Sequence, residues 1–255
     1  MNYQPIIELV KQAGAIVFDK TLRASVEMKG EADFVTAVDL RISQFVKEEL
    51  QQLTPQIGFM SEEEKGEIAP ERWVLDPIDG TTNLVYDYQM SSVSLAHVRD
   101  NTVLFGVVYN PYNHDLFIAE RGKGATLNGA PLPPAPDREL KDCLIEFGAG
   151  STKKQYADLS FALAKEVFQN CLDLRRICSS ALAICYVAAG RLNGYFERSL
   201  KPWDYAAATL ILEECGGKSL NWRGTSPSLE APDSFVCGTE KALAFLLQAI
   251  QNIEK

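Results

Sequence analysis

Hydrophobic side chains recur every three or four residues in two N-terminal stretches, the pattern of amphipathic helices. The first stretch runs from about Gln4 to Leu22, and the second begins after Thr36 and ends near Leu53. Thr36 and Asp39 have the spacing of a capping box, in which side chains at a helix start accept hydrogen bonds from each other's backbone N–H groups. We therefore expect two helices ahead of any sheet.

Alternating apolar and polar residues follow in four segments, 91–98, 102–109, 116–119 and 125–127. Turn residues such as Asn110-Pro111 separate them, so the pattern predicts hairpins and an antiparallel sheet. Two short apolar runs, 57–60 and 73–75, have the length and composition of further strands.

Beyond the proline-rich stretch 132–136 the pattern changes to strands alternating with helices, which favours an α/β layer. We expect strands near 144–147, 172–174, 194–196, 217–220 and 235–237, and helices near 154–168, 180–189, 204–214 and 240–252. The fold class is therefore α+β and α/β. Two subdomains, residues 1–135 and 136–255, are expected to share a cleft.

Acidic residues lie where the 73–75 strand ends. Asp76 and Asp79 are three residues apart, and Pro77 prevents further ladder pairing. Two carboxylates held on a stiff turn suit a hard divalent cation, while the N–H groups of Gly80 and Thr81 can face an anion. A cation site beside an anion site suits phosphoryl transfer to water. The alternative is a surface turn whose Asp and Pro serve turn chemistry alone.

Two further acidic positions are open to more than one interpretation. Glu62 begins a run of three glutamates, which is usually a solvated loop, but its place directly after a strand favours one glutamate facing inward. Asp204 follows Trp203 at the start of a predicted helix, where an acid stabilises the helix by roughly 1 kcal/mol without any further role. From position alone, helix capping is favoured for Asp204.

Composition narrows the possible functions. The chain has 255 residues, 46% hydrophobic and 23% charged, as in soluble globular proteins, and its net charge of −9 disfavours nucleic acid as a partner. No apolar run approaches the ~18 residues of a membrane span, and the N-terminus lacks the basic segment of a signal peptide. Six cysteines without a C-x-x-C pair indicate reduced thiols in a cytoplasmic protein, and two histidines argue against zinc or serine–histidine chemistry.

Several motifs together resemble the inositol monophosphatase family of magnesium-dependent phosphomonoesterases. The resemblance spans about Gln4 to Gln251 and rests on the stretches 33–39, 58–63, 73–83, 121–129, 203–204 and 213–217. It implies the layered αβαβα sugar-phosphatase fold, two or three Mg²⁺ ions, sensitivity to lithium and a homodimer.

The resemblance also implies a set of metal ligands. Glu62, Asp76 and the Ile78 carbonyl would hold one Mg²⁺ ion. Asp76, Asp79 and Asp204 would hold a second, and Glu62 would share a third. Carboxylates crowded in one cleft repel each other, by about 4 kcal/mol for two charges 4 Å apart at an effective dielectric of 20, so cations would stabilise such a cluster.

Further roles follow from the same resemblance. Asp39 with Thr81 would orient and activate the attacking water, unless Asp39 serves only as a helix cap. Gly80 and Thr81 amides would bind phosphate. Asp79, Ser180 and Glu197 would contact the substrate, unless Glu197 merely pairs with a neighbouring cation, Arg198 or Lys201.

Three positions complete the comparison. Lys29 resembles a loop lysine near the entrance of the site. Cys178 stands where the family pattern usually has glycine, so the wall of the substrate pocket is expected to be narrowed or its backbone angles altered. Residues 86–89 replace a usual His-Gly-Phe-Pro beside the metal-bearing turn.

The sequence thus predicts a phosphatase acting on a small polyol or sugar monophosphate, with inositol 1-phosphate as the best single substrate. Rivals within the superfamily are a fructose-1,6-bisphosphatase, a 3′-phosphoadenosine 5′-phosphate nucleotidase and an NADP phosphatase. A non-catalytic regulatory protein of the same fold is a further rival, although such a protein has no need of all five acids.

Overall fold

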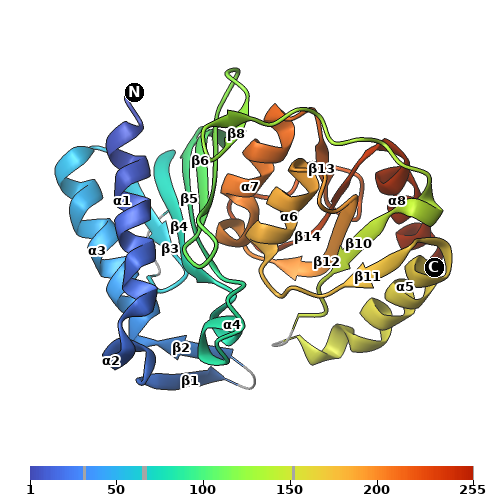
Figure 1. Ribbon diagram of the computed structural model, residues 1–255, viewed down its shortest axis with the longest axis horizontal. Helices are drawn as coiled ribbons and strands as arrows, with labels where there is room; N and C mark the ends of the chain where they lie inside the picture. Colours follow the sequence, from blue (N-terminus) through green and yellow to red (C-terminus); the bar gives the residue numbers. More distant parts are fainter. Residues whose placement is uncertain (31–32, 65–67, 151–152, 255) are drawn as a thin grey trace.

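The computed structural model describes residues 1–30, 33–64, 68–150 and 153–254, the side chains of 29, 30 and 33 excepted. Figure 1 shows five layers in the order αβαβα: α1 and α3 cover the outer face of the first sheet, α6 and α7 lie between the two sheets, and α5 and α8 cover the far face of the second. Three hydrophobic clusters fill the spaces between these layers. The predicted fold class is confirmed.

The first sheet has seven strands among the described residues, and all neighbours are antiparallel except the first pair. β3 runs parallel to β4, with Ser61 opposite Leu75. The strands, in spatial order, are β3 (Gly58–Ser61), β4 (Glu71–Asp79), β5 (Ser92–Arg99), β6 (Thr102–Asn110), β7 (Asp115–Glu120), β8 (Ala125–Leu127) and β9 (Ala130–Pro131). Because β3 and β4 are parallel, the residues that follow Ser61 and Leu75 lie side by side at the same end of these two strands.

The second sheet has five strands in the described part of the chain. Its order is β11 (Asp173–Arg175), β10 (Leu144–Phe147), β12 (Gly194–Leu200), β14 (Asp233–Gly238) and β13 (Lys218–Leu220). The C-terminal helices are α5 (Ala157–Asn170), α6 (Ser180–Ala188), α7 (Pro202–Glu214) and α8 (Glu240–Ile253), and short turns form η2 (Leu140–Asp142) and η3 (Lys154–Tyr156). The division into subdomains at residue 135 stays a prediction.

The N-terminal region differs from the expected single helix over residues 4–22. α1 (Gln4–Ala15) continues into η1 (Ile16–Phe18), and Asp19 then accepts hydrogen bonds from the backbone of Thr21 and Leu22 to start α2 (Lys20–Arg23). The prediction of one helix was wrong because an aspartate side chain competes for backbone N–H groups. Next come a hairpin of β1 (Val26–Gly30) and β2 (Asp33–Thr36), and then α3 (Ala37–Leu53).

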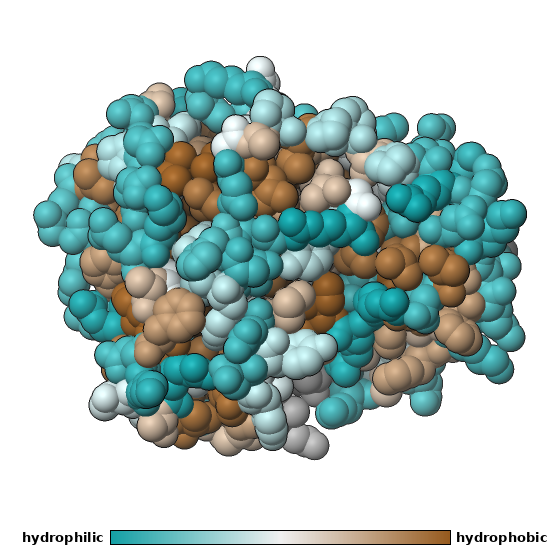
Figure 2. Space-filling model, in the orientation of Figure 1, coloured by the Kyte–Doolittle hydropathy of each residue, from teal (hydrophilic) through white to brown (hydrophobic). Residues whose placement is uncertain are grey.

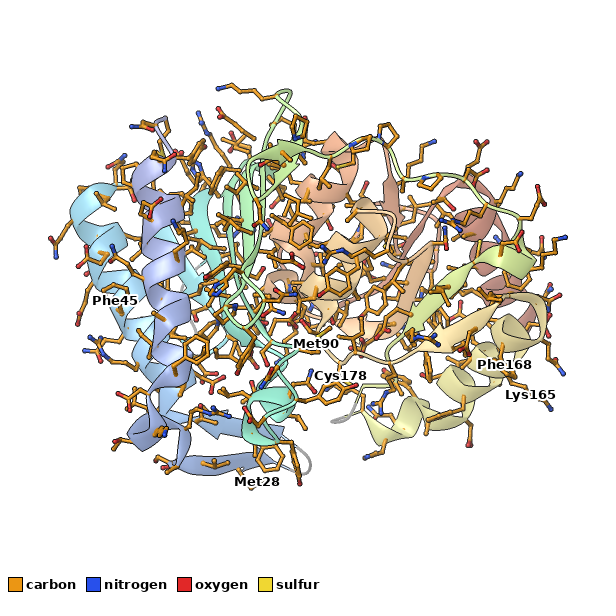
Figure 3. The ribbon with its side chains drawn as sticks, in the orientation of Figure 1. Met28, Phe45, Met90, Lys165, Phe168 and Cys178 are labelled. Atoms are coloured by element: carbon orange, nitrogen blue, oxygen red, sulfur yellow. The ribbon has the colours of Figure 1, made fainter. Side chains whose placement is uncertain are left out.

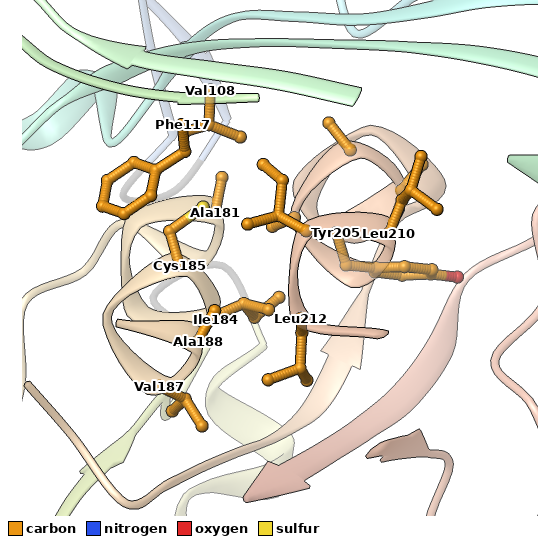
Figure 4. Packing of buried hydrophobic residues seen from close by; sticks show 14 of the residues in the cluster. Val108, Phe117, Ala181, Ile184, Cys185, Val187, Ala188, Tyr205, Leu210 and Leu212 are labelled. Carbon is orange, nitrogen blue, oxygen red and sulfur yellow. The ribbon is translucent and has the colours of Figure 1, made fainter. Parts of the chain in front are cut away.

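The two central helices are almost entirely buried. Figure 4 shows α6 and α7 side by side, with Ile184 of α6 and Leu212 of α7 between their axes and Phe117 of the first sheet beside α6. Small side chains let these layers approach closely. A Cβ atom added to Gly106 would lie 2.5 Å from the carbonyl oxygen of Ala207 in α7. No described helix is long and apolar enough to cross a membrane.

Gly106→Ala is therefore expected to push α7 away from the first sheet and to destabilise the protein by about 1–3 kcal/mol. Urea unfolding followed by circular dichroism would measure the change. Thr102→Ala on the exposed end of β6 is the control and should stay within about 0.5 kcal/mol of the native protein. An unchanged midpoint for Gly106→Ala would contradict the close contact.

Candidate active site

The predicted site residues meet around one cavity of about 330 Å³ between the two halves of the molecule. Nine of them line it: Glu62, Asp76, Ile78, Asp79, Gly80, Thr81, Ser180, Glu197 and Asp204. Cys178 also lines it, and Figure 3 shows Cys178 near Met90 at the junction of the N-terminal and C-terminal elements. Figure 2 shows hydrophilic and hydrophobic residues mixed on the surface around this junction.

Strand pairing explains how the first acids meet. The Glu62 N–H donates to the carbonyl of Leu75 at 3.2 Å, so β3 delivers Glu62 beside Asp76. Pairing was predicted to stop at Pro77, but β4 continues to Asp79, which lies opposite Ser92. The prediction was wrong because a shift in register between Asp76 and Asp79 accommodates the proline without ending the strand. The chain then turns at Gly80, whose φ of +94° favours glycine.

Asp76 is buried, and its Oδ1 atom has no hydrogen-bond partner in the described structure. Burial raises the pKa of Asp76 well above its usual value, and the negative charges of Glu62, Asp79 and Asp204 raise it further. A buried oxygen that lacks a donor but is surrounded by like charges is the environment that a bound cation would satisfy.

Asp79 is held by the start of α6. Its carboxylate accepts hydrogen bonds from the Ser179 hydroxyl, from the Ser180 N–H at 3.1 Å and from the Ala181 N–H at 2.9 Å. Burial raises the pKa of Asp79 to about 6, although these bonds oppose the rise. Sequence reasoning did not assign the role of Ser179, because the contact joins positions 100 residues apart.

Asp204 occupies the first turn of α7, where its Oδ2 atom accepts a hydrogen bond from the Lys201 N–H at 2.7 Å. The helix-capping interpretation is therefore confirmed, and the same side chain also lines the cavity. Burial raises the pKa of Asp204 well above its usual value, and the charges of Glu62 and Asp79 add to the rise.

The donor set fits Mg²⁺, which prefers carboxylate and carbonyl oxygens. Among the described residues no three acidic, imidazole or thiol side chains already form a compact metal cluster. To bind an ion, the acidic side chains around the cavity would therefore have to move closer together. The unpartnered Oδ1 atom of Asp76 is the structural observation that supports such a site.

Asp39 and Thr81 form a hydrogen-bonded pair next to the cavity. The Thr81 hydroxyl donates to Asp39 Oδ1 at 3.0 Å. The other oxygen, Oδ2, accepts from the N–H and the hydroxyl of Thr36, so the predicted capping box is present. One carboxylate thus caps α3 and contacts Thr81, and burial raises its pKa.

Glu197 faces the cavity on the side opposite the first sheet. The Tyr195 hydroxyl lies 2.6 Å from Glu197 Oε2 and 2.9 Å from Ser180 Oγ, and burial raises the pKa of Glu197 to about 7. Ion pairing with its neighbours does not occur: Arg198 pairs with Glu254 at 3.7 Å, and Lys201 lies over the Trp203 ring.

The residues that depart from the family pattern, Cys178 and the loop 86–89, include positions with a positive φ angle. Cys178 adopts a φ of +62°, in the left-handed region that favours glycine. Asp87 and Gln89 also have positive φ values, and the loop exposes Tyr86 and Tyr88. The role predicted for Lys29 lies outside the described side chains.

Comparison with known proteins shows to which family the chain belongs. The chain matches the model of the inositol monophosphatase family over residues 3–255, and it belongs to that family. It is 35% identical over 258 residues to an inositol-1-monophosphatase of Rhizobium meliloti, covering 97% of this chain and 95% of the relative. It is also 35% identical over 217 residues to the Nus factor SuhB of Escherichia coli, covering 83% of this chain and 81% of the relative.

Solved structures agree with the fold. The extragenic suppressor protein suhB of Bartonella henselae superposes with a TM-score of 0.90 at 31% identity, covering 96% of each chain. An IMPase/NADP phosphatase complexed with Mg²⁺ and phosphate superposes with a TM-score of 0.86 at 25% identity, covering 96% of this chain and 93% of that one. The resemblance and the fold predicted from the sequence are therefore confirmed.

The raised pKa values predict how stability depends on pH without metal. The carboxyl pKa rises from 3.8 to about 6 for Asp79 and from 4.5 to about 7 for Glu197. The folded state then holds protons that the unfolded state has lost, so stability falls as pH rises from about 4 to about 7. The loss is on the order of 3 kcal/mol per group.

Thermal melts in EDTA and in Mg²⁺ across this pH range would test the metal site without an activity assay. The melting temperature in EDTA should fall toward pH 8, and Mg²⁺ should raise it more at pH 8 than at pH 5. Equal stabilisation at both pH values would contradict a metal bound by these acids.

Proposed function

We propose that this protein is a Mg²⁺-dependent phosphomonoesterase that hydrolyses inositol monophosphate by attack of an activated water. The observation that carries the proposal is the buried Oδ1 atom of Asp76, which has no hydrogen-bond partner. It lies among the acids Glu62, Asp79 and Asp204. The similarity to an inositol-1-monophosphatase and to a phosphatase complexed with Mg²⁺ and phosphate supports it.

The ligands assigned to Mg²⁺ are Glu62, Asp76, the Ile78 carbonyl, Asp79 and Asp204, for two or three ions in all. When bound there, Mg²⁺ supplies positive charge for the phosphate and lowers the pKa of a coordinated water. Gly80 and Thr81, at the start of α4 (Thr81–Val85), offer backbone N–H groups to the phosphate oxygens.

Asp39 and Thr81 are assigned to the water. Because the Thr81 hydroxyl donates to Asp39, its oxygen can accept a hydrogen bond from the water. The water oxygen bonds to phosphorus as the bond from phosphorus to the alcohol oxygen breaks, and a proton of the attacking water passes through Thr81 to Asp39. The departing alkoxide takes up a proton from a second water molecule, and Asp39 later returns its proton to solvent. The raised pKa of Asp39 makes it a better base than an exposed aspartate.

Glu197 and Ser180 are assigned to the alcohol part of the substrate. Glu197 is held by Tyr195 and accepts hydrogen bonds from hydroxyl groups, as a polyol requires. Gly148 makes this possible, because a Cβ atom there would lie 1.8 Å from Glu197 Oε2.

A regulatory role is the second candidate, because two of the similar proteins carry the names Nus factor SuhB and extragenic suppressor suhB. The retention of five acids around one cavity favours the enzyme. We further propose a cytoplasmic homodimer without nucleic acid or membrane partners. The net charge of −9 supports the lack of a nucleic-acid partner. The six free cysteines support the cytoplasmic location. Lithium inhibition and the dimer rest on family membership.

Asp204→Asn should lower kcat/KM for inositol 1-phosphate by at least about 100-fold, because it removes one charged metal ligand. Phosphate release with Mg²⁺ is the measurement. Asp100→Asn, on an exposed turn, is the control and should retain full activity. If the Asp204→Asn protein folds and is nearly as active as the native protein, the assignment of Asp204 as a metal ligand is refuted.

Thr81→Ala should lower kcat by about 10²–10³, because the hydroxyl that links Asp39 to the water is lost. Thr81→Ser keeps this hydroxyl and should recover most of the rate. Single-turnover phosphate release distinguishes the two, and equal losses for Ala and Ser would show that the methyl group matters rather than the proton path.

A further inference from the structure

Residues 176–178, called here the 176–178 segment, lead into α6 and border the catalytic cavity. Arg176 and Cys178 line that cavity, and Figure 3 shows Cys178 close to Met90, where the two halves of the molecule meet. The φ of +62° at Cys178 is one that L residues other than glycine rarely adopt. Such a conformation persists only where surrounding contacts hold it.

Two side chains from opposite halves of the molecule hold this segment. From β10, Glu146 Oε1 accepts a hydrogen bond from the Ile177 N–H. From α4, the Asn83 side-chain amide donates to the Ile177 carbonyl at 2.8 Å and to the Met90 carbonyl at 2.7 Å. The peptide groups on both sides of Ile177 are therefore fixed, directly before the strained residue.

Glu146 is buried, and its second oxygen, Oε2, has no hydrogen-bond partner in the described structure. Burial raises the pKa of Glu146 to about 7, although hydrogen bonds from the Ile177 and Cys178 N–H groups oppose the rise. Burying a carboxyl group costs free energy, which an apolar residue in β10 would avoid. Since Glu146 is neither an assigned metal ligand nor an assigned substrate contact, what this carboxyl group provides is its hold on the 176–178 segment.

The position of the segment affects both ends of the proposed substrate. A Cβ atom added to Gly80 would lie 3.1 Å from the Cys178 carbonyl oxygen, so the segment packs against the residues assigned to the phosphate. Ser180, which is assigned to the alcohol, follows two residues after Cys178. A shift of the segment would therefore change the fit of the cavity to the substrate.

We propose that Glu146 is a positioning residue for the substrate, which together with Asn83 holds the 176–178 segment in its left-handed conformation. This role rests on the proposed phosphomonoesterase function and specifies how its substrate is held. The Thr81 hydroxyl bonds to Asp39 and to the Ile78 carbonyl and does not contact Glu146. Loss of the Glu146 carboxyl group should therefore weaken substrate binding more than it slows the chemical step.

Glu146→Met removes both carboxyl oxygens at nearly constant length. It should raise KM for inositol 1-phosphate about tenfold and change kcat less than about threefold. Glu146→Gln keeps an acceptor oxygen for the Ile177 N–H, so its KM should stay within about twofold of the native value. Phosphate release with Mg²⁺ is the measurement, and Glu8→Met on the exposed face of α1 is the matched control. A merely structural role would lower kcat through loss of folded protein and leave KM unchanged.

The strain at Cys178 allows a second test. Glycine adopts a φ near +62° without strain, so in a Cys178→Gly protein the segment should keep its shape without Glu146. Glu146→Met should then raise KM less than about threefold. Cys178→Ala also removes the thiol but keeps the Cβ atom, so in that protein Glu146→Met should still raise KM about tenfold.

A Glu146→Met protein with the native KM would overturn the inference, and so would equal increases in the glycine and alanine proteins. If Glu146→Met does not fold, Asn83→Ala removes the same hold from the side of α4. It should give the same increase in KM and the same rescue by Cys178→Gly, and an unchanged KM would again contradict the proposal.

A native protein that releases no phosphate from inositol 1-phosphate would refute the proposed function instead. Urea unfolding then tests the positioning of the 176–178 segment without an activity assay. While Glu146 holds the segment, Cys178→Gly should have a higher urea midpoint than Cys178→Ala, because only alanine is strained there. Equal midpoints would show that Glu146 holds no strained conformation.

Discussion

Repulsion among buried carboxylates is the constraint around which this structure is organised. Asp76 lies in a dry environment among other acids, and two charges about 4 Å apart cost about 4 kcal/mol even at an effective dielectric of 20. Folding alone therefore leaves part of the cluster protonated. A divalent cation relieves the repulsion and at the same time creates an attractive site for a phosphate dianion, so the instability of the empty cluster and the proposed chemistry have one origin.

The layered architecture brings these acids together from distant parts of the chain. The parallel pairing of β3 with β4 places Glu62 beside Asp76, whereas α7 delivers Asp204 from the centre of the molecule. The start of α6 holds Asp79 through three hydrogen bonds. The tight contact of Gly106 in β6 with Ala207 helps to fix the position of α7 against the first sheet, and thus the position of Asp204 at the start of that helix.

Local patterns predicted much of this arrangement. The capping box at Thr36 and the Asp204 helix start are each encoded within a few residues, and both are present. Asp76 and Asp79 were predicted on a turn but lie in the last residues of β4. Contacts between residues far apart in the sequence could not be predicted from such local patterns. The Ser179 contact with Asp79 arises only when the two halves meet. The helix break at Asp19 was missed because the apolar spacing continues past it.

Crystals soaked with Mn²⁺ and inorganic phosphate would test the central claim most directly, because anomalous scattering locates Mn²⁺ without assumptions about mechanism. The account predicts at least two peaks in the catalytic cavity, each within about 2.3 Å of an Asp76 oxygen, with Glu62 on one side and Asp79 or Asp204 on the other. A cavity without a peak, or peaks whose ligands exclude Asp76, would contradict it.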